Sequence, residues 1–287
     1  MMTAGQPSLS RRSAVIAAAL LCTVSLALGA NAALNKRPSE SGKAAATEQS
    51  AAATNGARLA LVIGNAHYPD ANAPLAQPIN DARALTAALR RGGFDVDVVE
   101  DATKEDMGRA LDRLKSRIKP DSVVMLFFGG YAIQAGRESY MIPVDAKIWR
   151  ESDVRREGTS VEQFVETIRA QGARAKLVVL DASRRNPYER RFRSYSHGLA
   201  PINAPANALI LSSATAGRVL DDPQDRSNSM LVSELLNQLG RSPSAEAVFT
   251  KTRNAIARST DGEQVPMVSS SLVEDIRLSA DMANAGS

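Results

Sequence analysis

Short apolar runs alternate along the chain with segments in which apolar residues recur at helical spacing. Several of the runs are apolar at every position, which is typical of parallel strands covered on both faces. The run Leu59–Ile63 is followed by Gly64-Asn65, so a turn is expected directly after it. The runs predict strands at residues 59–63, 94–99, 122–128, 176–180 and 207–211, and a short extended piece at 140–144.

Apolar residues three or four positions apart predict the intervening helices. Thr103 and Asp106 have the spacing of a capping box, and Ser160 is placed to cap another helix. Ser242-Pro243 is expected to open the last helix. Helices are predicted at residues 81–91, 107–118, 161–168, 229–239 and 244–258. This alternation predicts an α/β domain, a three-layer α/β/α sandwich around a mostly parallel sheet of about six strands.

The first residues follow the layout of a secretory signal peptide. Arg11-Arg12 precedes an apolar run at residues 14–28, and Ala30-Asn31-Ala32 offers an Ala-x-Ala cleavage site. We therefore predict a signal peptide at residues 1–32 and a periplasmic or secreted protein. The alternative is a membrane anchor through residues 14–28, if this segment stays uncleaved.

Composition divides the rest of the chain into three parts. Residues 33–56 are rich in small and polar residues without apolar periodicity, which predicts a flexible linker. Residues 57–275 are expected to form the domain, and residues 276–287 a C-terminal tail. Of the 287 residues, 44% are hydrophobic and 23% are charged, a balance that allows a sizeable core.

Charge and cysteine content exclude several function classes. The chain has 35 basic and 31 acidic residues, and loss of Arg11 and Arg12 with the signal peptide leaves 33 against 31. This near-neutral balance argues against nucleic acid as a partner. The single cysteine, Cys22, lies in the segment expected to be removed. The mature protein then has no thiol for a disulfide, a thiolate metal site or a nucleophile, and we expect no metal and no cofactor.

Two predicted strands end in segments that are candidates for an active site, because the carboxyl ends of strands hold the active sites of open α/β sheets. The segments read LFFGGYA at 126–132 and VLDASR at 179–184. They resemble the two strand ends of the caspase-like clan, in particular its bacterial metacaspase-like and orthocaspase-type members, which carry YYAGHG and LDACR there. Further matching segments lie at residues 58–96, 140–146, 180–188, 198–205 and 264–272.

The resemblance implies a caspase-like fold with a His–Cys dyad at positions that hold Tyr131 and Ser183 in this chain. The two positions are 52 residues apart, close to the roughly 50 expected between that His and Cys. In the family the thiolate attacks the scissile carbonyl and the histidine protonates the leaving amine. A serine hydroxyl without a base is a poor nucleophile, and a tyrosine phenol, with a pKa of about 10, stays protonated at neutral pH. We therefore predict a catalytically inactive pseudopeptidase that binds peptide or protein segments in a regulatory role.

The alternative is an active endopeptidase or serine-type hydrolase that uses Ser183. Such an enzyme needs a base, and the only histidines are His67 and His197, both in predicted loops. His197 follows Ser183 by 14 residues, in a loop that could fold over the same strand ends. A Ser183–His197 pair is the form that this alternative takes.

The resemblance also implies a specificity pocket for Arg or Lys side chains, with acidic residues at the positions of Asp81 and Asp181. Two carboxylates that converge on one pocket suit a guanidinium, which they can hold through bidentate hydrogen bonds. The expected partner is a peptide or protein ligand with an exposed Arg or Lys. Capping of local turns is the alternative role for both acids.

A basic segment follows the second strand end. It contains five arginines with Tyr188 and Phe192 among them: Arg184, Arg185, Arg190, Arg191 and Arg193. Such a run is typical of a solvated loop, and a contact surface for acidic partners is the alternative.

Overall fold

A computed structural model describes residues 56–71, 74–192, 198–220, 226–242 and 244–278. Internal contacts divide the chain into residues 1–49 and 50–287, and the described residues all belong to the second unit. The predicted signal peptide, the linker up to residue 55 and tail residues 279–287 lie outside the described part.

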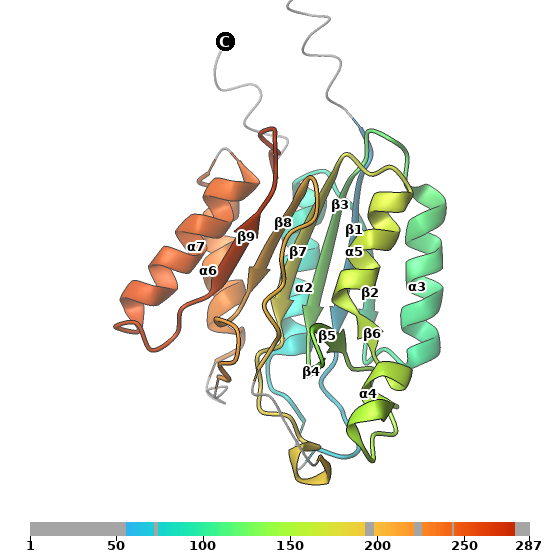
Figure 1. The fold of residues 1–287 in the computed structure, drawn as a ribbon. Helices are drawn as coiled ribbons and strands as arrows, with labels where there is room; N and C mark the ends of the chain where they lie inside the picture. Colours follow the sequence, from blue (N-terminus) through green and yellow to red (C-terminus); the bar gives the residue numbers. More distant parts are fainter. Residues whose placement is uncertain (1–55, 72–73, 193–197, 221–225, 243, 279–287) are drawn as a thin grey trace, which may run out of the picture. The chain divides into compact units, whose positions relative to one another are not determined.

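A six-stranded sheet forms the centre of the domain, in the order β2-β1-β3-β7-β8-β9. Its first five strands are parallel and β9 pairs antiparallel with β8, which confirms the predicted mostly parallel sheet. Figure 1 shows the strands side by side. The strands are β1 (Arg58–Gly64), β2 (Asp95–Glu100), β3 (Val123–Gly129), β7 (Ala175–Asp181), β8 (Ala208–Ser212) and β9 (Met267–Ser270).

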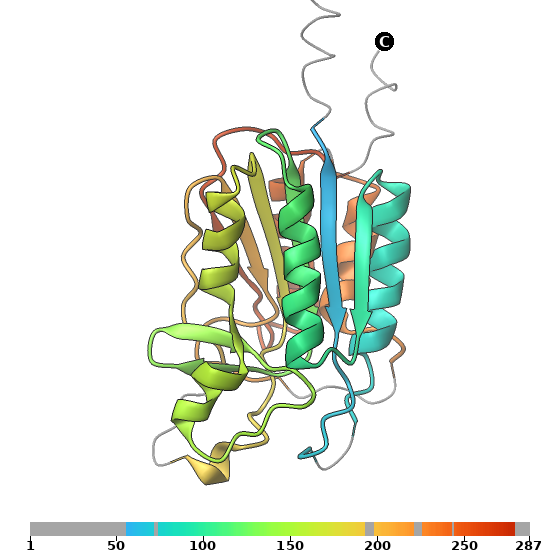
Figure 2. The same ribbon diagram turned by 90° about the vertical axis from the view of Figure 1, so that its right-hand side faces the viewer.

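Helices cover both faces of this sheet, as the apolar strands required. One face carries α3 (Lys104–Arg117) and α5 (Val161–Ala170). The other carries α2 (Pro78–Arg91), α6 (Met230–Leu239) and α7 (Ala245–Ser259). Figures 1 and 2 show the three layers, so the α/β/α sandwich is confirmed.

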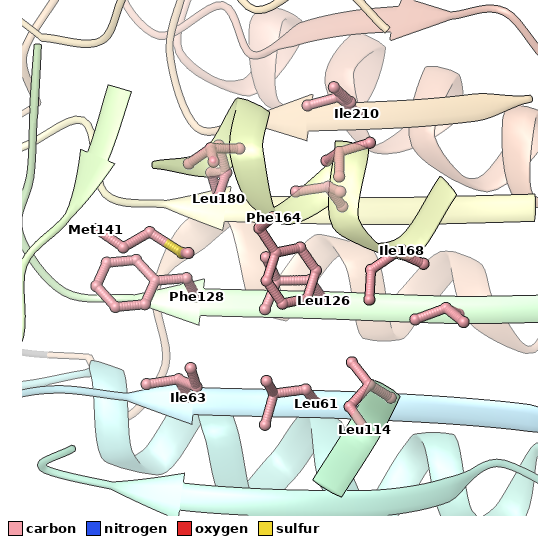
Figure 3. Close-up of a cluster of buried hydrophobic side chains, with 14 of the residues drawn as sticks. Leu61, Ile63, Leu114, Leu126, Phe128, Met141, Phe164, Ile168, Leu180 and Ile210 are labelled. Carbon is pink, nitrogen blue, oxygen red and sulfur yellow. The ribbon is translucent and has the colours of Figure 1, made fainter. Parts of the chain in front are cut away.

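Alternate residues of each strand belong to two separate hydrophobic clusters, because successive side chains of a strand point to opposite faces. On the first face, Leu61 and Leu126 pack with Leu114 of α3 and Phe164 of α5, as Figure 3 shows. On the second face, Phe127 is buried in the cluster that includes side chains of α2, α6 and α7. The sheet is thereby fixed from both sides, and its carboxyl edge is a rigid base for the segments that follow the strands.

Helix caps agree with the sequence at two of the three predicted starts, and the structure adds Ser229 as the cap of α6. Thr103 and Asp106 form the expected capping box, and the Ser160 and Ser229 hydroxyls accept from the backbone N–H groups of Gln163 and Val232. The start of α7 differs, because Ser244, not Ser242-Pro243, caps it by accepting from the Ala247 N–H. A serine hydroxyl one residue before the helix reaches the free N–H groups of the first turn, which a proline ring cannot do.

A small antiparallel sheet lies beyond the carboxyl ends of the main strands (Figure 1). It consists of β4 (Ala132–Ala135), β5 (Glu138–Met141) and β6 (Thr159–Ser160), and α4 (Glu151–Glu157) lies in the same part of the chain. The predicted extended piece at 140–144 supplies part of β5 and is not a strand of the main sheet. These short elements had no periodic signal in the sequence.

The end of the described chain packs against the domain. Ile276 and Leu278 are 1% and 3% exposed and belong to the second hydrophobic cluster. The Ala245 N–H also donates to the Ile276 carbonyl, at 2.6 Å. Across the described ranges, none of the helices combines the length and the apolar character needed to cross a membrane.

Candidate functional site

Two parallel strands bring the predicted site segments to one place. β3 and β7 pair in a register that sets Gly129 opposite Asp181, so Tyr131 and Ser183 each follow a paired residue by two positions. The Gly130 N–H donates to the Asp181 carbonyl at 3.3 Å, which holds the two chains together past the end of the ladder. The expectation that both residues lie at the carboxyl edge of neighbouring strands agrees with this register.

Gly130 and Tyr68 fix the backbone at Tyr131. Gly130 has a φ of +155°, and a Cβ there would lie 2.6 Å from the Tyr68 hydroxyl, so only glycine fits without displacement. That hydroxyl accepts from the Tyr131 N–H at 3.1 Å and donates to the Ile142 carbonyl at 3.0 Å. Burial raises the pKa of Tyr68, which keeps this phenol a donor. The rings of Tyr68 and Tyr131 meet edge to face, with centroids 4.8 Å apart.

Ser183 is enclosed at the end of β7. Ser183 is only 1% exposed, and its Oγ has no hydrogen-bond partner in the described part of the chain. Its N–H donates to the Ser213 Oγ at 3.4 Å, and its carbonyl accepts from the Leu220 N–H at 2.7 Å. No described base therefore takes a proton from the Ser183 hydroxyl.

The two histidines offer Ser183 no described partner. His67 lies after β1, where its Nδ1 is 2.6 Å from the Asp101 Oδ2. Asp101 also accepts from the backbone N–H groups of Ala66 and His67. His67 is thus engaged at the end of β2. His197, the other candidate base, lies outside the described residues.

Asp81 is fully buried in the first turn of α2, and its carboxylate reaches the start of α6. One oxygen accepts from the Asn228 side chain at 2.8 Å and from the Ser229 N–H at 3.0 Å. Gly64 permits this placement, because a Cβ there would lie 2.4 Å from the Pro78 carbonyl oxygen and hold the helix away. The other Asp81 oxygen has no hydrogen-bond partner among the described residues.

Asp81 and Asp181 lie close enough to influence each other. Burial, and secondly the negative charge of Asp181, raise the pKa of Asp81 from 3.8 to about 7, against the hydrogen bonds from Asn228 and Ser229. Asp181 is 4% exposed, and its Oδ2 has no hydrogen bond within the described chain. Each of these two buried carboxylates therefore has one oxygen that accepts no described hydrogen bond, and the charge of Asp181 acts on Asp81.

Arg184 supplies the positive charge of this cluster. Its Nη2 lies 3.8 Å from the Asp181 Oδ2, and its Nη1 donates to the carbonyls of Gly130, at 3.1 Å, and Asp181. At 5% exposure the guanidinium cross-links the ends of β3 and β7. Among the described residues, Arg184 thus lies beside Asp181, whereas no cation pairs with Asp81.

The remaining arginines of the basic segment serve separate contacts. Arg191 donates to the Ile148 carbonyl at 2.6 Å, pairs with Asp70 at 3.1 Å and stacks on the Trp149 ring at 4.7 Å. Arg185 is exposed, 3.7 Å from Glu189. Arg193 lies outside the described residues. Arg184 and Arg191 therefore bind backbone carbonyls, while Arg185 lies beside a neighbouring acid.

Sequence reasoning missed several residues that build the site. Asn65 ties three segments together: its side chain accepts from the Ala102 N–H and donates to the Ile142 carbonyl. Tyr68 positions Tyr131, and Ser213 meets the Ser183 N–H. A usable signal was present for Asn65 and Ser213, since each is a polar residue directly after an apolar strand. Within the described ranges, no group of three His, Cys, Asp or Glu residues is arranged to hold a metal ion.

Comparison with known proteins gives two findings. A family model described as a caspase domain matches residues 57–277. The chain is also 32% identical over 89 residues to the human mucosa-associated lymphoid tissue lymphoma translocation protein 1, and equally to its mouse homolog. These matches cover 31% of this chain and 11% of each relative, so the chain spans only a small part of their length.

Proposed function

The chain belongs to the caspase domain family, and from this premise we propose that it is a pseudopeptidase that binds Arg- or Lys-bearing peptide segments without cleaving them. The observation that carries the proposal is the burial of the Ser183 hydroxyl without a described base beside it. Its hydroxyl is buried and has no described hydrogen-bond partner, while the described histidine is engaged by Asp101. Among the described residues, no base is placed to activate this serine.

The chemistry of Tyr131 supports the same proposal. The resemblance assigns the proton-transferring group of the family to this position. A phenol holds its proton at neutral pH, so it cannot accept and return a proton as an imidazole does. The backbone N–H of Tyr131 is instead bound by the Tyr68 hydroxyl, which suits a structural role for this residue.

Recognition of a cation is supported by the charges at the strand ends. Arg184 lies beside Asp181, and Asp81 has no cationic partner among the described residues. A ligand guanidinium between Asp81 and Asp181 would provide it through charge-assisted hydrogen bonds. In this proposal the ligand segment is held at the edge of the sheet and is released intact.

The hydrolysis assay tests this function directly. We expect no turnover of fluorogenic Arg- and Lys-containing peptides by residues 33–287, and no change on Ser183→Ala. Tyr131→His combined with Ser183→Cys is the matched gain-of-function variant, because it restores an imidazole and a thiol at the two strand ends. Turnover by the unaltered protein that disappears in Ser183→Ala would instead establish the serine-type hydrolase.

The proposal includes a periplasmic or secreted location. Its support is the arrangement of Arg11-Arg12, the apolar run at 14–28 and the Ala-x-Ala site before residue 33. Expression of the full chain followed by N-terminal sequencing of the exported protein is expected to give Ala33 as the first residue. A protein that retains residues 14–28 and sediments with membranes would favour the anchor.

A further inference from the structure

A groove opens between α6 and α7, and its described lining includes neither Asp81 nor Asp181. It encloses about 580 Å³, within the range of ligand pockets. Its apolar lining comes from Met230 at the start of α6 and from Ala255 and Ile256 near the end of α7. Ile256 is 1% exposed and belongs to the hydrophobic core, so the groove has a firm base.

Two arginines line the groove and have no acidic partner in the described structure. Arg226 precedes α6 and Arg258 lies in the last turn of α7, and both are exposed. Many other exposed arginines of the domain are paired, for example Arg83 with Glu100 and Arg169 with Glu166. Within the described ranges, neither guanidinium at the groove is paired with an acid, so each can bind an anion.

One acid, Glu234, also lines the groove. Its carboxylate accepts from the side chains of Asn237, at 3.3 Å, and Gln238, at 2.6 Å. These donors lie further along α6, so they hold the carboxylate by local contacts. Counted over the described residues, the lining then carries two positive charges against one negative charge, a net charge of +1.

From these charges and the apolar base we infer that the groove between α6 and α7 binds an acidic peptide segment of a partner protein. The carboxylates of such a segment would contact Arg226 and Arg258, and an aliphatic side chain between them would cover Met230, Ala255 and Ile256. Arginine suits this task because its planar guanidinium binds a carboxylate through two parallel hydrogen bonds. The groove is independent of the proposed Arg/Lys recognition, since it shares no residue with it.

The groove also lies beside the segment that holds Asp81. Asn228 and Ser229 bind the Asp81 carboxylate, and Met230 follows them directly. The Ser227 carbonyl accepts from the Asn80 side chain at 3.1 Å. An acidic segment in the groove would thus contact Arg226 and Met230, the two ends of the stretch 226–230. The residues between them hydrogen-bond to Asn80 and Asp81 of α2.

Nuclear magnetic resonance titration tests the inference with defined probes. Acetyl-Glu-Leu-Glu-amide is added to the isotope-labelled mature protein, with acetyl-Gln-Leu-Gln-amide as the uncharged match. We expect saturable shifts of the Met230, Ala255 and Ile256 methyl signals with the Glu peptide, and at least threefold weaker binding of the Gln peptide. Equal binding of the two peptides, or no shift of these signals at millimolar peptide, overturns the inference.

Variants separate the groove from the rest of the surface. Arg226→Ala and Arg258→Ala should each weaken the Glu peptide about two- to fivefold, as expected for exposed ion pairs, and Glu234→Gln should strengthen it. Arg253→Ala is the matched control, an exposed arginine on α7 that does not line the groove. An equal loss in Arg253→Ala would show that the peptide follows general surface charge, and the inference would fail.

Discussion

Asp181→Ala is expected to weaken the binding of an Arg-bearing peptide by more than tenfold. Asp181 is 4% exposed and has one oxygen with no described hydrogen bond, so its charge acts on a ligand cation with little screening by water. Loss of one partner of a buried charge pair costs about 2–5 kcal/mol, whereas an exposed pair contributes about 0–1 kcal/mol. Isothermal titration with the peptide and its citrulline counterpart measures the difference.

Matched variants keep this test specific. Asp112 lies on α3 with a side chain that is 72% exposed, so Asp112→Ala removes a carboxylate that cannot reach the strand ends. Asp181→Asn keeps the shape of the side chain and removes only its charge. Since Asp181 also pairs with Arg184, thermal unfolding of each variant identifies any loss of fold. Equal affinity of the unaltered protein for the Arg and citrulline peptides would assign both acids a structural role.

The second large effect is a loss of stability as the pH rises. The pKa of Asp81 is 3.8 as a free side chain and about 7 in the folded protein, because burial and the charge of Asp181 disfavour its ionised form. Between these values the folded protein binds more protons at this residue than the unfolded chain. Stability from Asp81 is therefore complete below about pH 4 and is lost as the pH rises through 7. Each pKa unit corresponds to about 1.4 kcal/mol, so the loss reaches up to about 4 kcal/mol.

Urea denaturation at pH 5 and pH 8 measures the part of this loss that falls above pH 5, about 3 kcal/mol. Asp81→Asn keeps an oxygen that can accept from the Ser229 N–H but cannot ionise, so its free energy of unfolding should change less between the two pH values. Asp112→Asn is the control and should follow the unaltered protein. An Asp81→Asn variant with the same pH dependence as the unaltered protein would show that this carboxyl group does not titrate near neutral pH.

The central layers of the fold were predictable because their signal is physical and local. Strands such as β1 and β3 are buried on both faces and therefore read as continuous apolar runs. Thr103 and Ser160 indicated the starts of α3 and α5, because the free N–H groups of a first turn need an acceptor. Parallel pairing of neighbouring strands then brings Tyr131 and Ser183 to one edge without further information.

The rest depended on tertiary contacts that no local pattern encodes. β9 is a short edge strand of half-buried and exposed residues, so it lacks the continuous apolar run of the inner strands. Arg184 belonged to a run that predicted a solvated loop, yet its guanidinium turns inward to the Gly130 and Asp181 carbonyls. Tyr68 lies in a loop, and its role depends on a segment that is distant in sequence. The Tyr131 N–H, directly after Gly130, donates to the Tyr68 hydroxyl. A single sequence does not reveal such partners.

Calorimetric titration of the unaltered mature protein with an Arg-containing peptide distinguishes a pseudopeptidase from an active hydrolase, because it detects binding and turnover in one trace. We expect heats that saturate near one peptide per chain, a weaker response to the citrulline peptide, and full recovery of intact peptide by mass spectrometry. A continuous heat that persists between injections, with cleaved peptide in the cell and loss of both in Ser183→Ala, would contradict the pseudopeptidase proposal.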